Sequence, residues 1–258
     1  MTDIRPIRPP EAETFLELLC DVFGLDMSRA HNLFFEDPLF DLRRKWALFE
    51  ANEMVSILTT SPLEFGWGRA YGIAGVATKE SRRGEGHAGK LIERVHREAK
   101  RTGEGAALLL AKEFGLYERL GFEPLDRVIR APIATVPEGL IPPAMHVEEV
   151  RAMYSAWADG HPDRLRRDRV RWKLWKWHFR ECTPFKDGYI CFENDTLREG
   201  LWSEPQAALP LPRNAEWFGT TLMADMLEVP LAAPATIELF LMGLDIPGVP
   251  QLFMTDQF

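Results

Sequence analysis

The sequence predicts an α/β protein built from two halves, and three observations support this fold class. Between residues 71 and 111, a strand, an amphipathic helix and a buried strand follow one another, which is the order of a parallel crossover. Prolines cluster beyond Arg130, where they would interrupt a sheet. The elements expected after this cluster echo the order before it. A chain of 258 residues with 46% hydrophobic residues can hold one large core or two small ones.

The elements before residue 70 are expected to be short, because turn and cap residues interrupt the apolar runs. Gly24 follows a run of apolar residues at helical spacing and would end that helix. Asn52 would lie in a turn between two strands. The expected elements are a strand at Asp3–Ile7, helices at Pro10–Phe23 and near Arg29–Phe35, and strands at Trp46–Phe49 and Glu53–Leu58.

The crossover is the most regular part of the pattern. A strand is expected at Tyr71–Thr78, and a helix at His87–Arg101 has its apolar residues on one face and charged residues on the other. Gly103 is the expected C-cap of this helix. The run Ala106–Ala111 is apolar at every position, as expected of a parallel strand that is buried on both faces.

A domain boundary is expected in the proline cluster, so residues 1–135 form one predicted domain and residues 136–258 a second. The second domain should carry no cofactor loop. Its expected elements are helices at Val147–Trp157 and Arg167–Phe179, strands at Gly188–Glu193 and Leu197–Ser203, a loop marked by Pro205, Pro210 and Pro212, a strand near Thr220–Leu227, a helix near Ala233–Met242 and a last strand near Gln251–Asp256.

Charge and composition disfavour several classes of function. The formal net charge of −8 would repel nucleic acid and anionic membranes, so neither is an expected partner. No segment is apolar over the length that crosses a bilayer, which predicts a cytoplasmic protein. The three cysteines are scattered and share no metal-ligand spacing with the six histidines, so reduced thiols, no disulfide and no metal are expected.

The segment Val76–Ala88 contains the most informative motif, a strand that runs through a glycine-bearing turn into a helix. Unpaired amides and the helix dipole at such a helix start favour a pyrophosphate. Arg82 and Arg83 would add positive charge nearby. A dinucleotide-binding site would need more glycines and an acidic residue after the next strand, and a Walker loop would need Gly-Lys-Ser/Thr after the glycines. Neither pattern is present.

Glycines alone would fit an ordinary tight turn equally well, but their context favours a cofactor site. The sequence Arg83-Gly84-Glu85-Gly86-His87-Ala88 fits the Arg/Gln-x-x-Gly-x-Gly/Ala signature of the GNAT superfamily of N-acetyltransferases, directly after a Val-Ala-Thr strand end. The chain therefore resembles a GNAT enzyme. This resemblance implies tandem GNAT-like domains, each with a mixed, mostly antiparallel central sheet flanked by helices, and acetyl-CoA as the acetyl donor.

A second segment, Leu108–Phe122, resembles the GNAT signature in which a strand meets a short helix that bears a tyrosine. An isolated Tyr117 would more often be a packing residue than a catalyst. Beside the phosphate loop, it is the expected acid. A departing CoA thiolate is expelled more easily when a neutral group with a pKa near ~10 protonates it. A backbone N–H at the end of the Val76–Thr78 strand is the expected donor to the carbonyl oxygen.

Within the superfamily, the two halves together resemble the Eis-like acetyltransferases, which fuse two GNAT-like domains. The residues that carry this resemblance are Gly75-Val76-Ala77-Thr78, Arg82-Arg83-Gly84, Leu116–Phe122, Val150–Trp157, Arg166 and Trp172. The implied cofactor contacts are Val76, Ala77, Thr78, Arg82, Arg83, Gly84, Glu85, Gly86, His87, Ala88, Gly89, Lys112 and Glu113.

The general base is the point at which the sequence departs from that family. Eis-like enzymes carry a third, sterol-carrier-like domain whose terminal carboxylate serves as the base, and this chain ends at Phe258 before such a domain. Glu113 is the first candidate base, although a charge at a helix start is an equally common role. The carboxylate of Phe258 is an alternative only if the last strand or a partner subunit brings it to the cleft.

A basic, aromatic segment, Arg164–Arg180, would suggest nucleic-acid stacking in a basic protein, but the acidic balance favours another role. Val170, Leu174 and Trp177 are expected to form an apolar stripe that packs on the second domain's sheet.

The sequence as a whole predicts an acetyl-CoA-dependent N-acetyltransferase. Acetyl would pass directly to a primary amine in a ternary complex, with Tyr117 as the acid and Glu113 as the candidate base. The acceptor is a small-molecule or peptidyl amine, and the acidic balance favours a cationic one. A noncatalytic acyl-CoA-binding or regulatory module is the alternative, and so is a structural pair of domains. Assembly into a homo-oligomer stays open.

Overall fold

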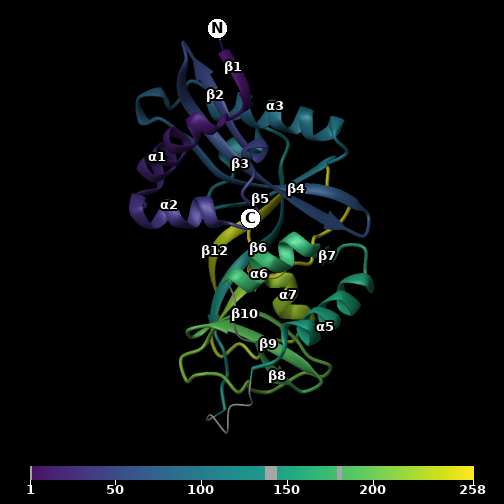
Figure 1. Cartoon of the computed structure of the whole chain (residues 1–258). Coiled ribbons are helices and arrows are strands. Elements are labelled where there is room, and N and C mark those ends of the chain that lie inside the picture. Colours follow the sequence, from purple (N-terminus) through teal and green to yellow (C-terminus); the bar gives the residue numbers. More distant parts are fainter. Residues whose placement is uncertain (1, 137–143, 179–181) are drawn as a thin grey trace.

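One continuous sheet runs through both halves of the chain. The computed structural model describes residues 2–136, 144–178 and 182–258. Its 12 strands are ordered β1-β2-β3-β4-β5-β12-β6-β11-β10-β9-β8, and β7 pairs with β3 (Figure 1). The β4–β5 and β10–β11 pairs are parallel and the other pairs between named strands are antiparallel. The predicted fold class, α/β with a mixed, mostly antiparallel sheet flanked by helices, is confirmed.

The elements of the N-terminal half lie close to their predicted positions. The crossover helix and the strand after it have their predicted bounds, whereas the strand after the Asn52 turn is longer than predicted and reaches Phe65. The elements are β1 (Thr2–Pro6), α1 (Ala12–Phe23), α2 (Met27–Glu36), β2 (Lys45–Glu50), β3 (Glu53–Phe65), β4 (Gly68–Thr78), α3 (His87–Arg101), β5 (Ala106–Ala111), α4 (Gly115–Glu118) and β6 (Glu123–Pro132).

Helices α1 and α3 cover opposite faces of this part of the sheet. Phe15 and Leu18 of α1 pack with Ile57 and Ala77. On the other face, the buried side of α3 packs with Ile73 of β4 and with side chains of β5. Because side chains of a strand alternate between faces, each residue of β4 and β5 can be assigned to the α1 face or the α3 face.

A strand from the C-terminal half lies in the middle of the sheet. Strand β12 (Thr236–Leu244) pairs antiparallel with β5 on one side and with β6 on the other. Strands β5 and β6 are therefore neighbours of β12 and do not pair with each other in the strand order. The sheet that positions the crossover thus depends on residues more than a hundred positions later in the chain.

The C-terminal half contains helices and strands in a different order from the predicted one. Its elements are α5 (Val147–Asp159), β7 (Leu165–Arg166), α6 (Arg169–His178), β8 (Cys182–Phe185), β9 (Gly188–Glu193), β10 (Thr196–Leu201), β11 (Glu216–Thr220), α7 (Thr221–Met226) and β12. The structure confirms two predicted helices, α5 and α6, and two predicted strands, β9 and β10. Strand β9 has its predicted bounds, and the bounds of the other three differ from the predicted ones by one to a few residues. Part of the helix expected to end at Phe179 lies outside the described residues.

Three predictions near the end of the chain are wrong. The segment near Thr220–Leu227 is mainly the helix α7, because the Thr220 hydroxyl accepts a hydrogen bond from the Met223 amide and caps it. The segment near Ala233–Met242 is mainly the strand β12, whose central position lets it bury apolar residues on both faces. Residues 251–256 form an isolated bridge at Gln251 and a short 3-10 helix, Met254–Asp256, in place of a strand.

The aromatic helix α6 packs into the core of the C-terminal half. Trp172 and Trp175 are buried there among side chains of α5 and of β8–β11. Val170, predicted to lie on the packing stripe, is instead 39% exposed. The buried face is set by Arg171, Trp172, Leu174 and Trp175, because Arg171 turns inward to bind backbone oxygens of Pro62 and Asp256.

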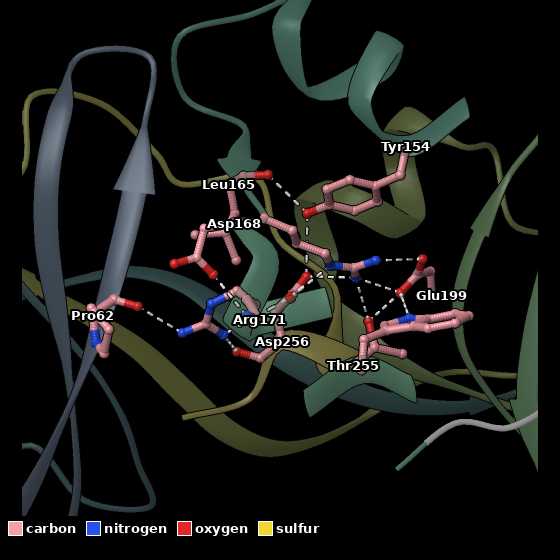
Figure 2. Close-up of polar contacts among 10 residues, drawn as sticks. Pro62, Tyr154, Leu165, Asp168, Arg171, Glu199, Thr255 and Asp256 are labelled. Carbon is pink, nitrogen blue, oxygen red and sulfur yellow. Dashed lines mark hydrogen bonds and ion pairs between the residues drawn. The ribbon is translucent and has the colours of Figure 1, made fainter. Parts of the chain in front are cut away.

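A buried ionic cluster lies beneath α6 (Figure 2). The Arg167 guanidinium donates hydrogen bonds to both Glu199 and Asp256, with shortest N–O distances of 2.6 and 2.7 Å, and all three side chains are 0–1% exposed. The Glu199 carboxylate also accepts hydrogen bonds from the Tyr189 hydroxyl and the Trp175 indole nitrogen, at 2.5 and 3.0 Å. This cluster joins β10 to the end of the chain, where the Phe258 ring covers Gly72 of β4.

The described residues bear on two further predictions from the sequence. Cys20, Cys182 and Cys191 are buried free thiols, and Cys182 lies directly opposite Cys191 in the β8–β9 pair. Within the described ranges, no helix combines the length and apolar character needed to cross a membrane.

Candidate active site

The sheet opens between β4 and β5 on the N-terminal side of the molecule. The two strands pair in parallel from Ala70–Ala106 to Ile73–Leu109, where their pairing ends. Beyond this point β4 contains a bulge: Ile57 of β3 pairs with Ala77, but Thr59 pairs with Ala74, so Gly75 and Val76 together face one residue. Gly75 has a φ of 59°, which favours glycine. The bulge turns β4 away from β5 and leaves backbone groups of Val76 out of the ladder.

A cleft follows from this opening. Its larger chamber has a volume of about 990 Å³ and extends from β4 and the end of β5 to α4 and the end of α1. A second chamber of about 470 Å³ lies at the start of α3. The two chambers share the lining residues Val76, Arg83, Gly84, Leu116, Tyr117 and Arg119, so they form one continuous site.

The smaller chamber is built around the N-terminus of α3. Gly84 and Gly86 have φ angles of 83° and 76°, and no atom lies within 4 Å of a β-carbon built on either. The first α-helical hydrogen bond runs from the Lys90 amide to the Gly86 carbonyl, and no side chain caps the helix. The amides of His87–Gly89 therefore lack intrahelical partners, which is the arrangement that binds phosphate.

Arg82 has a different role from the one predicted by charge alone. Its guanidinium binds Glu50 and Glu85, with shortest N–O distances of 2.5 and 2.8 Å. The hydrogen bond from Arg82 is the main cause that lowers the pKa of Glu85 to about 2. His87 is buried, and its Nε2 lies 3.0 Å from a Glu85 oxygen. Glu50, Glu85 and His87 have the spacing of a cation site, but the Arg82 guanidinium already pairs with both carboxylates.

Tyr117 projects from α4 at the junction of the two chambers. Its ring packs edge-to-face on Phe122, with 6.0 Å between ring centroids, and Gly121 ends the turn with a φ of 86°. Burial raises the pKa of the Tyr117 phenol, so the neutral form persists well into the basic range. In the described residues, no hydrogen-bond partner is recorded for its hydroxyl. A phenol in this state can donate a proton to a group bound in the cleft.

The structure brings most of the predicted site residues together. Val76, Thr78, Arg82, Arg83, Gly84, Gly86, His87, Ala88 and Gly89 line the smaller chamber, and Lys112 and Glu113 line the larger one. Two predicted contacts do not line either chamber. Ala77 is 2% exposed and packs under α1 because the bulge sends its side chain to that face, and Glu85 is held by Arg82.

Several lining residues escaped the sequence analysis. Arg119 is part of the tyrosine motif and lines both chambers, so its position in that motif was an available signal. Phe23 and Leu239 line the larger chamber from α1 and β12. No local pattern marks them, because their place in the site depends on contacts between distant segments.

Comparisons with known proteins agree with this geometry. Residues 3–125 match the family described as the acetyltransferase (GNAT) domain. The match ends near the start of β6 and includes the cleft residues contributed by α1, β4, α3, β5 and α4. A search of curated protein sequences found no significant match.

Solved structures share the fold over nearly the whole chain. A GCN5-related N-acetyltransferase from Kribbella flavida has a TM-score of 0.73 and 14% identity, and the alignment covers 94% of this chain and 70% of that one. A GCN5-related N-acetyltransferase from Anabaena variabilis has a TM-score of 0.66 and 15% identity, and the alignment covers 94% of this chain and 72% of that one. Eis1 from Mycobacterium abscessus has a TM-score of 0.63 and 18% identity, and the alignment covers 93% of this chain and 73% of that one. The likeness thus covers the C-terminal half as well as the matched domain.

Proposed function

We propose that the protein is an acetyl-CoA-dependent N-acetyltransferase of the Eis-like type, which passes acetyl directly to a primary amine in a ternary complex. The observation that carries the proposal is the continuous cleft, with unpaired amides of α3 at one end and the Tyr117 phenol at the junction of its chambers. The proposed division of labour keeps catalysis in residues 1–135 and gives residues 136–258 a supporting role.

Each part of the cleft has a role in this proposal. The amides at His87–Gly89 bind the diphosphate, and Arg83 adds positive charge at the same place. The pantetheine arm then runs between the separated strands, beside Lys112. A backbone N–H in the Val76 bulge donates to the thioester oxygen, whose negative charge grows as the amine attacks.

The reaction needs one proton donor and one proton acceptor. The neutral amine attacks the thioester carbon, a C–N bond forms, and the C–S bond then breaks. Tyr117 donates its proton to the departing sulfur. Glu113, at the rim of the larger chamber, accepts the proton that the substrate ammonium loses to become the neutral amine, directly or through water. The groups that perform these steps all line the larger chamber, and no covalent enzyme intermediate is needed.

A thiol-release assay with acetyl-CoA and a panel of amines tests this proposal. The Tyr117→Phe variant should lose about 10²- to 10⁴-fold in kcat, because the phenol's proton is missing when the thiolate leaves. Its affinity for CoA, measured by calorimetry, should stay unchanged, since the ring still packs on Phe122. Tight CoA binding without thiol release on any amine would favour the noncatalytic acyl-CoA-binding module instead.

The pH dependence of kcat tests the acid assignment separately. Burial raises the pKa of Tyr117 above its ordinary value of 10.0. The acid is therefore protonated below that pH, and its loss should lower kcat only at higher pH. The Tyr117→Phe variant should lack this basic limb. An identical profile for wild type and Tyr117→Phe would contradict the assignment.

A further inference from the structure

The larger chamber passes through the sheet, and part of its lining comes from the α1 face. Strand alternation assigns Ala74, Leu110 and Leu239 to the α1 face, and Phe23 lies at the end of α1 on the same side. All four residues are apolar. The Phe258 ring covers Gly72 and packs, as Leu110 does, against the apolar cluster that contains Leu241, so the apolar surface continues beyond the chamber.

Among the described residues, four charged ones also line the larger chamber of the cleft. The charged residues that line the larger chamber are Arg83, Lys112, Glu113 and Arg119. Arg83 and Arg119 also line the chamber at the α3 N-terminus, which places them at the cofactor end. Among the described residues that line the larger chamber, Glu113 is the single carboxylate.

A polycation would bind poorly in such a site. Each additional ammonium group needs a carboxylate or water when it leaves bulk solvent, because an unpaired charge is costly to desolvate. An apolar body, in contrast, gains free energy from contact with Phe23, Leu110 and Leu239.

We propose that the acceptor is a primary amine with one ammonium group on an apolar body, and that Phe23 and Leu239 form the wall that selects it. This inference rests on the proposed function and refines it. The ammonium lies near Glu113, where it loses a proton before attack, and the apolar body lies against the α1 face of the cleft.

Substrate preference in the thiol-release assay is the first test. The kcat/KM for 2-phenylethylamine should exceed that for spermidine or kanamycin by about tenfold or more, because the phenyl group buries apolar area that the polyamines lack. A higher kcat/KM for the polyamines would overturn this inference and leave the proposed function intact. No release with any amine would overturn both.

The wall residues give a matched pair of variants. Phe23 is 51% exposed, so Phe23→Ala should leave the fold intact and lower kcat/KM for 2-phenylethylamine about tenfold, with little change for ethylamine. Leu25, 48% exposed and outside the cleft lining, provides the control, because Leu25→Ala should change neither value.

A carboxylate placed at position 23 should change kcat/KM in opposite directions for a polyamine and for an apolar amine. Phe23→Glu should raise kcat/KM for spermidine and lower it for 2-phenylethylamine, since the new carboxylate can pair with a second ammonium. Calorimetry with the CoA complex should show the same shift in amine affinity without turnover. Equal effects of Phe23→Glu on both amines would overturn the proposed selecting role of this wall.

Discussion

Two ionic clusters in this molecule are each centred on one arginine and two carboxylates, but their surroundings are opposite. In each, one arginine lies between two carboxylates: Arg82 between Glu50 and Glu85, and Arg167 between Glu199 and Asp256. Side chains of the first cluster are 26–46% exposed and lie at the cofactor loop. Those of the second are 0–1% exposed and lie beneath α6 (Figure 2).

Similar ion pairs are therefore expected to contribute differently to stability, depending on whether water surrounds them. At the surface, water and salt screen the attraction, so the Arg82 cluster orders a loop without adding much stability. In the interior, each charge has lost its water and depends on its partners. We therefore expect changes in the Arg167 cluster to alter the stability of the C-terminal half, and changes in the Arg82 cluster to alter the order of the turn before α3.

The largest predicted effect is that of Arg167→Met. This substitution removes the cation that pairs with the buried Glu199 and leaves Asp256 with the longer, 3.9 Å contact to Arg171, so it should lower the free energy of unfolding by about 3–5 kcal/mol. Urea unfolding, followed by tryptophan fluorescence, measures the loss. Arg82→Met is the matched control, and the two variants should differ clearly. Equal stabilities of the two variants would contradict the comparison.

A smaller loss is expected when Glu199 is neutralised together with Arg167. The double variant Arg167→Met, Glu199→Gln no longer leaves Glu199 as a buried unpaired charge, and it keeps Asp256 beside the buried Arg171, so it should be more stable than Arg167→Met alone. The comparison of the two urea midpoints separates the cost of an unpaired charge from the loss of packing. If the double variant is the less stable one, the ion pairs themselves contribute the stability.

The effect of Arg82→Met on cofactor binding should be smaller again. Without this guanidinium, Glu50 and Glu85 repel each other beside the start of α3, and the loop loses order before the ligand binds. The Kd for CoA should rise several-fold while the urea midpoint stays at the wild-type value. Calorimetry at low and high salt measures the first quantity. An unchanged Kd would mean that the loop is held by its backbone alone.

The smallest predicted effect is on acid stability. The Arg82 hydrogen bond lowers the pKa of Glu85 from 4.5 to about 2, so its contribution is complete above pH 4.5 and is lost as the pH falls toward 2. Solvent screening keeps this contribution small. An NMR titration should show the pKa of Glu85 moving back toward 4.5 in Arg82→Met. A pKa that stays near 2 would assign the shift to another group.

The fold class and the glycine turn before α3 were predictable because their signals are local. The alternation of elements, the amphipathic face of α3 and the apolar run of β5 each lie within a short window. The Arg83–Ala88 motif is local in the same way, because Gly84 and Gly86 supply the positive φ angles that its turn needs. For such elements, local pattern and tertiary packing favour the same structure.

The acceptor side of the cleft and the end of the chain were not predictable in this way. Residues 233–242 have apolar spacing that fits a helix, but the gap between β5 and β6 selects a strand. Leu239 enters the cleft only through that pairing. The charge of Arg82 suggested a phosphate contact, whereas its nearest partners come from β2 and from its own loop. These outcomes depend on which distant segments meet.

The central position of β12 has a consequence for biosynthesis. The crossover that holds the cofactor loop leaves the ribosome early, but the strand that fills the gap beside β5 is translated more than a hundred residues later (Figure 1). Until then, the facing edges of β5 and β6 are open to other chains. A nascent chain should therefore reach its native cleft only after Leu244 has emerged, and chaperones that shield strand edges should improve its yield.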